Sequence, residues 1–187
     1  MILAFDTSGP YCAAALLGSD GTVVASASED MTRGQAERLF PMLDALLHEA
    51  GADWSDLTRI GVGIGPGNFT GIRISVSAAR GLALGLGIPA IGVSSFEAIH
   101  HTNPQAIAAV PAPRDQAYLC APGDTPRLVP LADATAAHLP PAPAQLAASI
   151  ARVAQHKSTD QRPAPLYIRQ ADAAPSRTLP PVLLDGC

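Results

Sequence analysis

The stretch "GVGIGPGNFTGIR", residues 61–73, holds five glycines and one proline in thirteen positions, and it constrains the fold most strongly. Glycine inside a strand allows another backbone to pack closely against it. The GPG tripeptide at residues 65–67 predicts a tight turn, and Asn68 or Thr70 is suited to cap a helix after that turn. The sequence therefore predicts a buried strand that turns sharply into a helix.

The same glycines are similar to a phosphate-binding loop, but their spacing fits neither common template. In a P-loop the last glycine precedes lysine and then serine or threonine, whereas Gly71 precedes Ile72 and Arg73. The dinucleotide-binding pattern GxGxxG fails because Asn68 stands where the third glycine is required. We therefore interpret the stretch as a structural turn, with only the general attraction of a helix N-terminus for anions.

Strands and helices follow one another in a recognisable order through the first hundred residues. The segments "ILAFDTS", "YCAAALLG" and "GTVVASASE" predict three strands whose short connections favour antiparallel pairing. A helix is expected over residues 36–50, starting late or kinking at Pro41, and a second over residues 70–86. The strand "IPAIGVS" and a helix capped by Ser94 and Glu97 follow. This order predicts an α/β fold with the mixed sheet of a ribonuclease-H-like lobe.

The distribution of glycine and proline predicts two lobes. Fourteen of the 16 glycines precede residue 100, whereas 14 of the 18 prolines lie between residues 104 and 181. We expect a first lobe over residues 1–102 and a smaller Pro-rich lobe over residues 103–187, whose C-terminal segment packs back on the first. A hairpin is expected around Arg114-Asp115. Whether residues 121–165 are ordered stays open.

Composition excludes several classes of protein. Hydrophobic residues make up 48% of the 187, enough for a core, and no apolar run reaches 18 residues. The N-terminus has no signal-peptide pattern, so we expect a cytoplasmic protein without a membrane contact. Three cysteines without paired spacing argue against disulfides. A net charge of −4 and a single lysine, Lys157, argue against independent nucleic-acid binding.

The predicted helix over residues 70–86 has one face that is nearly bare of side chains. Four residues recur at intervals of four on this face: Arg73, Ser77, Gly81 and Gly85. We expect the opposite side, with Ile72, Ile74, Val76 and Leu84, to pack on the sheet. A bare helix face lets another helix approach closely, and the residues alone leave open whether that helix is internal or belongs to a partner.

These segments together resemble the TsaB family of bacterial tRNA threonylcarbamoyladenosine biosynthesis proteins. The similarity is carried by "GQAERLFPMLDALLHEAG", by the block from "GVGIGPGNFTGIR" to "IPAIGVSSFEAI" and by "APLYIRQADAAPS". It is strong over residues 1–99 and thinner beyond them. The resemblance implies the actin/Hsp70/sugar-kinase fold, with two ribonuclease-H-like lobes of which the second is reduced.

The resemblance also implies a role without catalysis of its own. The family is regarded as inert paralogues of TsaD, which transfers a threonylcarbamoyl group to N6 of the adenosine beside the anticodon. TsaB pairs with TsaD, and the ATPase TsaE joins them. TsaB would contact tRNA only as part of this complex. The pairing uses two helices, here residues 36–50 and 70–86, which also suit a homodimer. The expected interface residues are Leu39, Leu43, Arg73, Ser77, Gly81 and Gly85.

A metal site is not expected, because the catalytic relative's HxxxH pair has no counterpart in "RGQAERLF", where Gln35 and Leu39 cannot serve as ligands. Asp6, with Thr7 and Ser8, occupies a position that the superfamily uses near nucleotide phosphates. The alternative role of Asp6 is to cap a turn. We expect no cofactor of the chain's own, and ATP or ADP at most at the TsaD interface.

The leading hypothesis is therefore a scaffold subunit without catalytic residues, because no nucleophile with a neighbouring base is found in the sequence. An alternative is a small ATP-binding or ATP-hydrolysing enzyme of the same superfamily, motivated by the Asp6 turn and the glycine loop. A metallopeptidase ranks last because the metal-binding histidine pair is missing.

Overall fold

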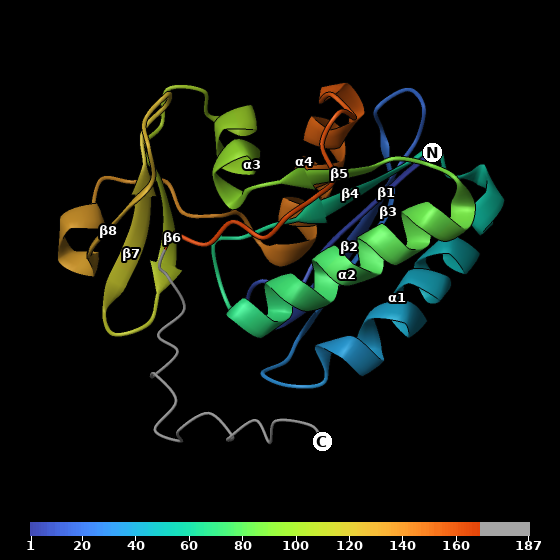
Figure 1. Cartoon of the computed structure of the whole chain (residues 1–187), viewed down its shortest axis with the longest axis horizontal. Coiled ribbons are helices and arrows are strands. Elements are labelled where there is room, and N and C mark those ends of the chain that lie inside the picture. Colours follow the sequence, from blue (N-terminus) through green and yellow to red (C-terminus); the bar gives the residue numbers. More distant parts are fainter. Residues whose placement is uncertain (169–187) are drawn as a thin grey trace, which may run out of the picture.

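A computed structural model describes residues 1–168 and shows two sheets of different size (Figure 1). The larger sheet has the order β3-β2-β1-β4-β5, in which β1 pairs antiparallel with β2 and parallel with β4. Its strands are β1 (Ile2–Asp6), β2 (Tyr11–Leu17), β3 (Val23–Asp30), β4 (Arg59–Gly63) and β5 (Ala90–Val93). The expected three antiparallel strands, followed by strands alternating with helices, are confirmed.

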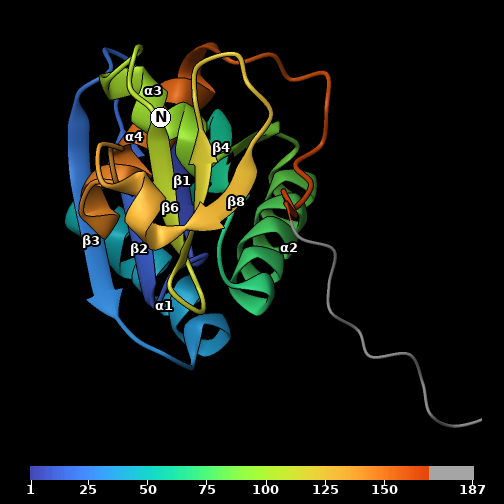
Figure 2. The ribbon, with the colours of Figure 1, turned by 90° about the vertical axis from the view of Figure 1, so that its left-hand side faces the viewer.

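Helices cover both faces of the larger sheet (Figures 1 and 2). On one face, α1 (Gln35–Glu49) and α2 (Phe69–Leu86) lie side by side and share a hydrophobic core with β1, β2 and β4. On the other face, α4 (Pro143–His156) packs on β1, β2 and β4. The short helix α3 (Ser95–Thr102) follows β5, and two 3-10 turns span Trp54–Asp56 and Leu131–Ala134.

The predicted helix boundaries hold, with one correction at Pro41. The helix α1 does not start late, because it begins at Gln35 and Pro41 lies inside it. Pro41 and Glu37, whose carbonyl loses its helical partner, are both exposed, so water can solvate that carbonyl. Asn68 caps α2 by accepting from the Gly71 amide at 2.9 Å. Ser94 and Glu97 form the expected capping box of α3.

The second sheet is small and antiparallel, with β6 (Ala108–Ala112), β7 (Gln116–Cys120) and β8 (Arg127–Pro130) in sequential order. The predicted hairpin is confirmed, and Arg114 and Asp115 take φ values of 63° and 52°, as a primed hairpin turn requires. The strand β8 was not predicted. The reduced second lobe is therefore this three-stranded sheet rather than a full ribonuclease-H-like unit.

The helix α4 was also not predicted, and it changes how residues 103–168 relate to the first lobe. Its residues Leu146, Ile150 and Ala154 belong to the core that α4 forms with the larger sheet. The division at residue 102 thus does not separate two independently packed halves. The predicted packing of the C-terminal segment concerns in part residues 169–187, which lie outside the described residues, and it stays a prediction.

The single lysine fixes the end of α4. Lys157 Nζ donates to the carbonyl oxygen of Gly92 at 2.9 Å and forms an ion pair with Glu97. From β4, Arg59 Nη1 donates to the carbonyl oxygens of Ala154 and Lys157, at 3.1 Å each. These contacts join α4 to β4, β5 and α3, so Lys157 has a structural role.

The glycine loop is shaped by the turn between β1 and β2, which packs directly against it. A Cβ atom on Gly71 would lie 1.9 Å from the Thr7 carbonyl oxygen, and one on Gly67 would lie 2.3 Å from the Ser8 carbonyl oxygen. Thr7 Oγ1 donates to the Gly71 carbonyl at 2.7 Å, and the Asn68 amide donates to the Ser8 carbonyl at 2.7 Å. The glycines therefore allow the turn to touch the first turn of α2.

Substituting Gly71→Ala should destabilise the fold, because the new methyl group meets a backbone atom that cannot move independently. We expect the free energy of unfolding to fall by about 1–3 kcal/mol, the usual cost of overpacking. The matched control is Gly81→Ala in the same helix, where a Cβ meets nothing within 4 Å. The control should gain about 0.5–1 kcal/mol. Urea unfolding of both variants measures the difference, and equal effects would contradict this packing.

Candidate functional site

The carboxylate of Asp6 lies at the end of β1 and is only 1% exposed. Its Oδ1 accepts from the Ser8 amide at 3.1 Å, and its Oδ2 accepts from the Ser8 hydroxyl at 2.8 Å and from the Tyr11 hydroxyl at 2.7 Å. Burial raises the pKa of the Asp6 carboxyl, although these hydrogen bonds act to lower it. Burial and the neighbouring Asp6 also raise the pKa of the Tyr11 hydroxyl.

This arrangement bears on the predicted nucleotide site at Asp6, Thr7 and Ser8. Thr7 is 0% exposed and Ser8 is 4% exposed, because the first turn of α2 covers them. A nucleotide phosphate would have to displace that turn to reach any of the three residues. The hydrogen bonds of Asp6 fit the other role that the sequence allowed, which is to hold a turn of the backbone together, and nucleotide binding stays a prediction.

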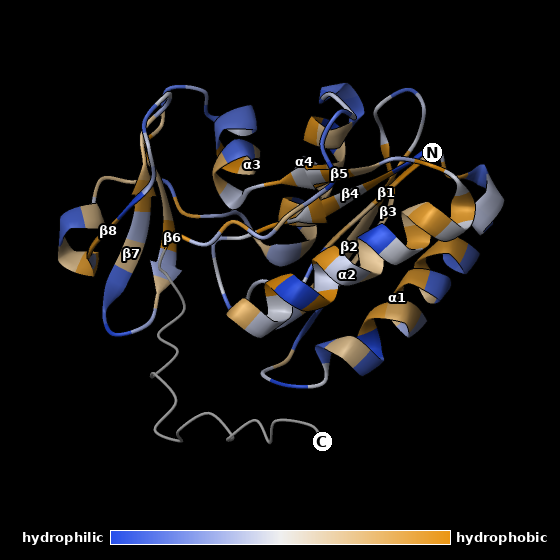
Figure 3. Cartoon of the chain, in the orientation of Figure 1, coloured by the Kyte–Doolittle hydropathy of each residue, from blue (hydrophilic) through white to orange (hydrophobic). Residues whose placement is uncertain are grey.

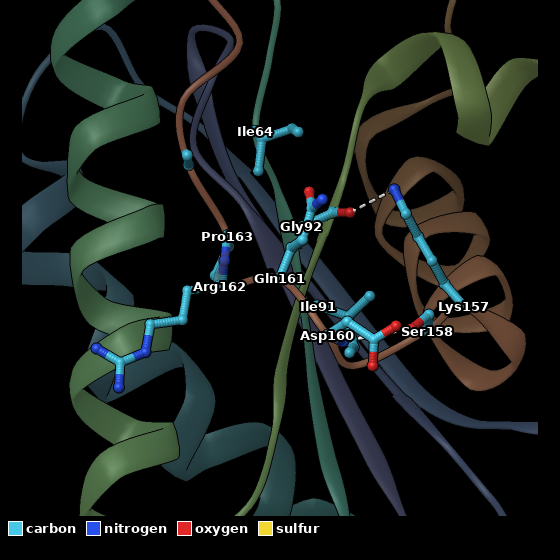
Figure 4. A pocket seen from close by; sticks show the side chains of 10 residues that line it. Ile64, Ile91, Gly92, Lys157, Ser158, Asp160, Gln161, Arg162 and Pro163 are labelled. Carbon is cyan, nitrogen blue, oxygen red and sulfur yellow. Dashed lines mark hydrogen bonds between the residues drawn. The ribbon is translucent and has the colours of Figure 1, made fainter.

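A second candidate is a pocket of about 290 Å³ beside β5, which Figure 4 shows with its lining side chains. Lys157 lines it, but its ammonium group already bonds to Gly92 and Glu97. Burial acts to raise the pKa of the Glu97 carboxyl, but hydrogen bonds from Lys157 and Ser94 and the charge of Lys157 outweigh it and leave that pKa lowered. The pocket's most buried cation is thus neutralised within the chain.

The third candidate is the outer face of α2, where four predicted interface residues are exposed together. These residues are Arg73, Ser77, Gly81 and Gly85. A Cβ atom on either glycine would meet nothing within 4 Å, so the helix backbone is open to a close approach. Figure 3 shows that the side of α2 facing the viewer is mostly pale or orange, with few hydrophilic segments.

The prediction is wrong for two of the interface residues. Leu39 and Leu43 on α1 are 0% exposed and belong to the core beneath the helix, so no partner can reach them. Sequence reasoning missed Phe40, which is 43% exposed on the outer side of α1. When three neighbouring positions of a helix are all apolar or aromatic, they cannot all face the protein core, so at least one of them must be exposed. This is the sequence signal that could have identified Phe40.

Leu84 also differs from expectation, because it does not pack on the sheet and is 86% exposed. It stands twelve residues after the buried Ile72, which at 100° per residue turns it about 120° away from the sheet. Its exposed side chain extends the outer face of α2. We call the surface formed by Ser77, Gly81, Leu84 and Gly85 the α2 outer face.

Arg73 marks the N-terminal end of that surface and is held by two aromatic rings. Its guanidinium carbon lies 3.9 Å from the ring centroid of Phe69, and its Nε donates to the Tyr167 hydroxyl at 3.2 Å. The rings of Phe69 and Tyr167 stack with centroids 4.7 Å apart. The Leu166 amide donates to the Ile64 carbonyl at 2.8 Å. The motif "LYIRQADAAP" thus begins against α2, while residues 169–187 lie outside the described part.

Within residues 1–168, no three His, Cys, Asp or Glu side chains gather in a geometry that would hold a metal ion. Among the same residues, no helix combines the length and the apolar character needed to span a bilayer.

The buried Asp6 predicts a pH dependence of stability. Because its pKa is raised in the folded protein above the ordinary 3.8, the folded state binds the proton more tightly than the unfolded state. The free energy of unfolding contributed by this group therefore falls as the pH rises from about 3.8 through the folded value. We expect Asp6→Asn to abolish this fall in urea unfolding measured at a series of pH values. Asp133→Asn, at an exposed position, is the control, and an unchanged profile in Asp6→Asn would contradict the assignment.

Comparison with known proteins supplies the family. The family model described as "TsaD: tRNA N6-adenosine threonylcarbamoyltransferase" matches residues 27–138. The chain is 44% identical over 95 residues to the tRNA threonylcarbamoyladenosine biosynthesis protein TsaB of Escherichia coli K12, covering 51% of this chain and 40% of that protein. It is 35% identical over 145 residues to an uncharacterized protein of Mycobacterium tuberculosis H37Rv, covering 76% and 69% respectively.

Solved structures agree with the sequence relatives. YeaZ from Pseudomonas aeruginosa aligns with a TM-score of 0.55 and 36% identity, over 68% of this chain and 63% of that one. A second Pseudomonas aeruginosa structure, of an uncharacterized protein described as similar to peptidase YEAZ, aligns with a TM-score of 0.69 and 27% identity, over 90% and 99%.

The chain spans 40–51% of the length of the TsaB relatives that it matches. The expected actin/Hsp70/sugar-kinase fold is confirmed by the mixed sheet and by these similarities. The TsaD-type family model matches more than half of this chain, and several TsaB proteins are similar to it in sequence. The chain therefore belongs to the TsaB family.

Proposed function

We propose that this chain is a non-catalytic scaffold subunit that pairs with TsaD in forming N6-threonylcarbamoyladenosine in tRNA. One observation carries the proposal: the α2 outer face combines two open glycines with a leucine that is 86% exposed. The names of the TsaB relatives and the TsaD description of the matching family model support the pathway.

The physical basis of the pairing is close helix packing. At Gly81 and Gly85 the backbone of α2 is bare, so a partner helix can pack at the short end of the usual 8–10 Å interaxial range. Burying a leucine side chain such as Leu84 contributes about 1.5–3 kcal/mol. The partly exposed ring of Phe40 on the neighbouring helix α1 offers further apolar area.

A scaffold role also agrees with the state of three ionisable groups, of which Asp6 is buried and Glu97 and Lys157 are partly buried. The Asp6 carboxylate is covered and accepts three hydrogen bonds, and Glu97 and Lys157 neutralise each other. We assign the chemistry to TsaD and place ATP or ADP, with TsaE and tRNA, at the assembled complex. By binding one conformation of TsaD more tightly, this subunit would raise the population of that conformation.

The substitution Gly81→Arg should abolish pairing with TsaD, because a long charged side chain then fills the bare face. The isolated fold should persist, since the site is open and arginine favours helices. Pull-down with TsaD and tRNA modification by purified components are the two measurements. We expect both signals to be lost together.

The matched control is Ala136→Arg, which adds the same side chain at an exposed position in the small second lobe. It should leave pairing and modification unchanged. Full-rate modification by purified TsaD and TsaE without this chain would refute the proposal. The mass of the species formed on mixing with TsaD separates the heterodimer from a homodimer that uses the same face.

A further inference from the structure

A second groove lies on the β5 side of α2. It measures about 430 Å³ and is bounded by the C-terminal half of α2, the start of β5 and residues 159–163. Arg80 projects from α2 and Arg162 from the segment after α4, and both line the groove. In Figure 4, the Arg162 side chain extends away from Lys157 and toward α2.

The charged side chains that line this groove are all positive. Its lining contains the two arginines and no acidic residue, although the chain as a whole has a net charge of −4. Among residues 1–168, the ion pairs are Arg38 with Glu29 and Lys157 with Glu97. Asp160, the carboxylate nearest in sequence to Arg162, lines the other pocket, which Arg162 lines as well, but the two residues form no ion pair. Two guanidinium groups on facing walls therefore have no counter-charge in the described part of the chain.

The floor of the groove is apolar and adjoins an open strand edge. Leu84, Ile88 and Pro163 line it together with Ala90, the first residue of β5. The strand β5 is the last in the sheet order. Ala90 is paired with Ile60 of β4, whose amide bonds to the Pro89 carbonyl. In a parallel ladder this register directs the N–H and C=O of Ala90 away from β4, toward the open side.

We propose that this groove binds an extended acidic segment of a protein partner. A carboxylate of the segment lies between Arg80 and Arg162 and accepts charge-assisted hydrogen bonds from both. Neighbouring apolar side chains rest on Leu84 and Pro163, and the segment's backbone bonds to Ala90 as an added strand. The apolar floor and the free strand edge favour a peptide over a nucleic-acid backbone, which carries phosphates but no strand-pairing groups.

The groove shares Gly81 and Leu84 with the α2 outer face, but its binding of a peptide does not require TsaD. Arg80 and Arg162, the two charged residues of the groove, do not belong to the α2 outer face, and Ser77 and Gly85 do not line the groove. Binding at the groove can therefore be measured on this chain alone. A failure there would leave the proposed scaffold function untouched, because that function is tested by Gly81→Arg and TsaD.

The test is fluorescence anisotropy with a labelled, acetylated peptide of alternating valine and glutamate. The double variant Arg80→Glu/Arg162→Glu should weaken its binding at least tenfold. The matched control, Arg33→Glu/Arg127→Glu, makes the same change of net charge at exposed positions away from the groove and should bind as the parent does. The same peptide with every second backbone amide nitrogen methylated should also bind at least tenfold more weakly, because the methylated nitrogens have no N–H to donate to a strand edge.

Two comparison probes decide the class of ligand. A valine–lysine peptide of equal length should not bind, and a single-stranded oligouridylate should bind more weakly than the acidic peptide. The proposal is overturned if the oligouridylate binds as tightly, if the acidic peptide does not bind at millimolar concentration, or if both double variants behave alike. Circular dichroism of each variant verifies that it is folded.

Discussion

The contact between the β1–β2 turn and the first turn of α2 is the constraint on which the rest of the structure depends. It places the carbonyl oxygens of Thr7 and Ser8 where side chains on Gly71 and Gly67 would otherwise lie. Because the helix begins in direct contact with the end of β1, its direction and rotation over the sheet are set at its N-terminus. The α2 outer face is a consequence of that rotation.

The same contact explains why the chain's most buried carboxylate serves structure. Asp6 ties together the turn that α2 covers, and its hydrogen bonds come from Ser8 and Tyr11. Gly63 completes this environment, because a Cβ there would lie 2.1 Å from Asp6 Oδ1. The side chain of Asp6 is thus fully engaged by neighbouring residues of the chain. The α2 outer face, in contrast, is open to a partner.

The sequence predicted the first lobe well because local signals determine it. Short apolar segments and turn residues identified β1 to β3, and helical spacing and caps identified α1 to α3. The sequence explained the glycines only in part, because Gly67 and Gly71 are required by close contact with a turn some sixty residues earlier in the chain. Their contact with Thr7 and Ser8 is a tertiary contact, which no local sequence pattern encodes.

The later chain was harder to predict for a similar reason. The helix α4 stands among prolines that obscured its pattern, and its partner strands β1, β2 and β4 lie about 80 residues or more earlier in the chain. At the candidate interface, spacing correctly grouped Ser77, Gly81 and Gly85, but it did not give the rotation of either helix. Leu39 and Leu43 were therefore placed outside although they are core, and Leu84 was placed inside although it is exposed.

The central claim is that the α2 outer face is the surface that TsaD covers. Hydroxyl-radical footprinting tests it most directly, because Leu84 is 86% exposed and Leu139, in the second lobe, is 58% exposed. Oxidation of both leucines is measured by mass spectrometry with and without TsaD. The account predicts that Leu84 becomes protected while Leu139 reacts as before. Unchanged oxidation of Leu84 in a stoichiometric complex would contradict it.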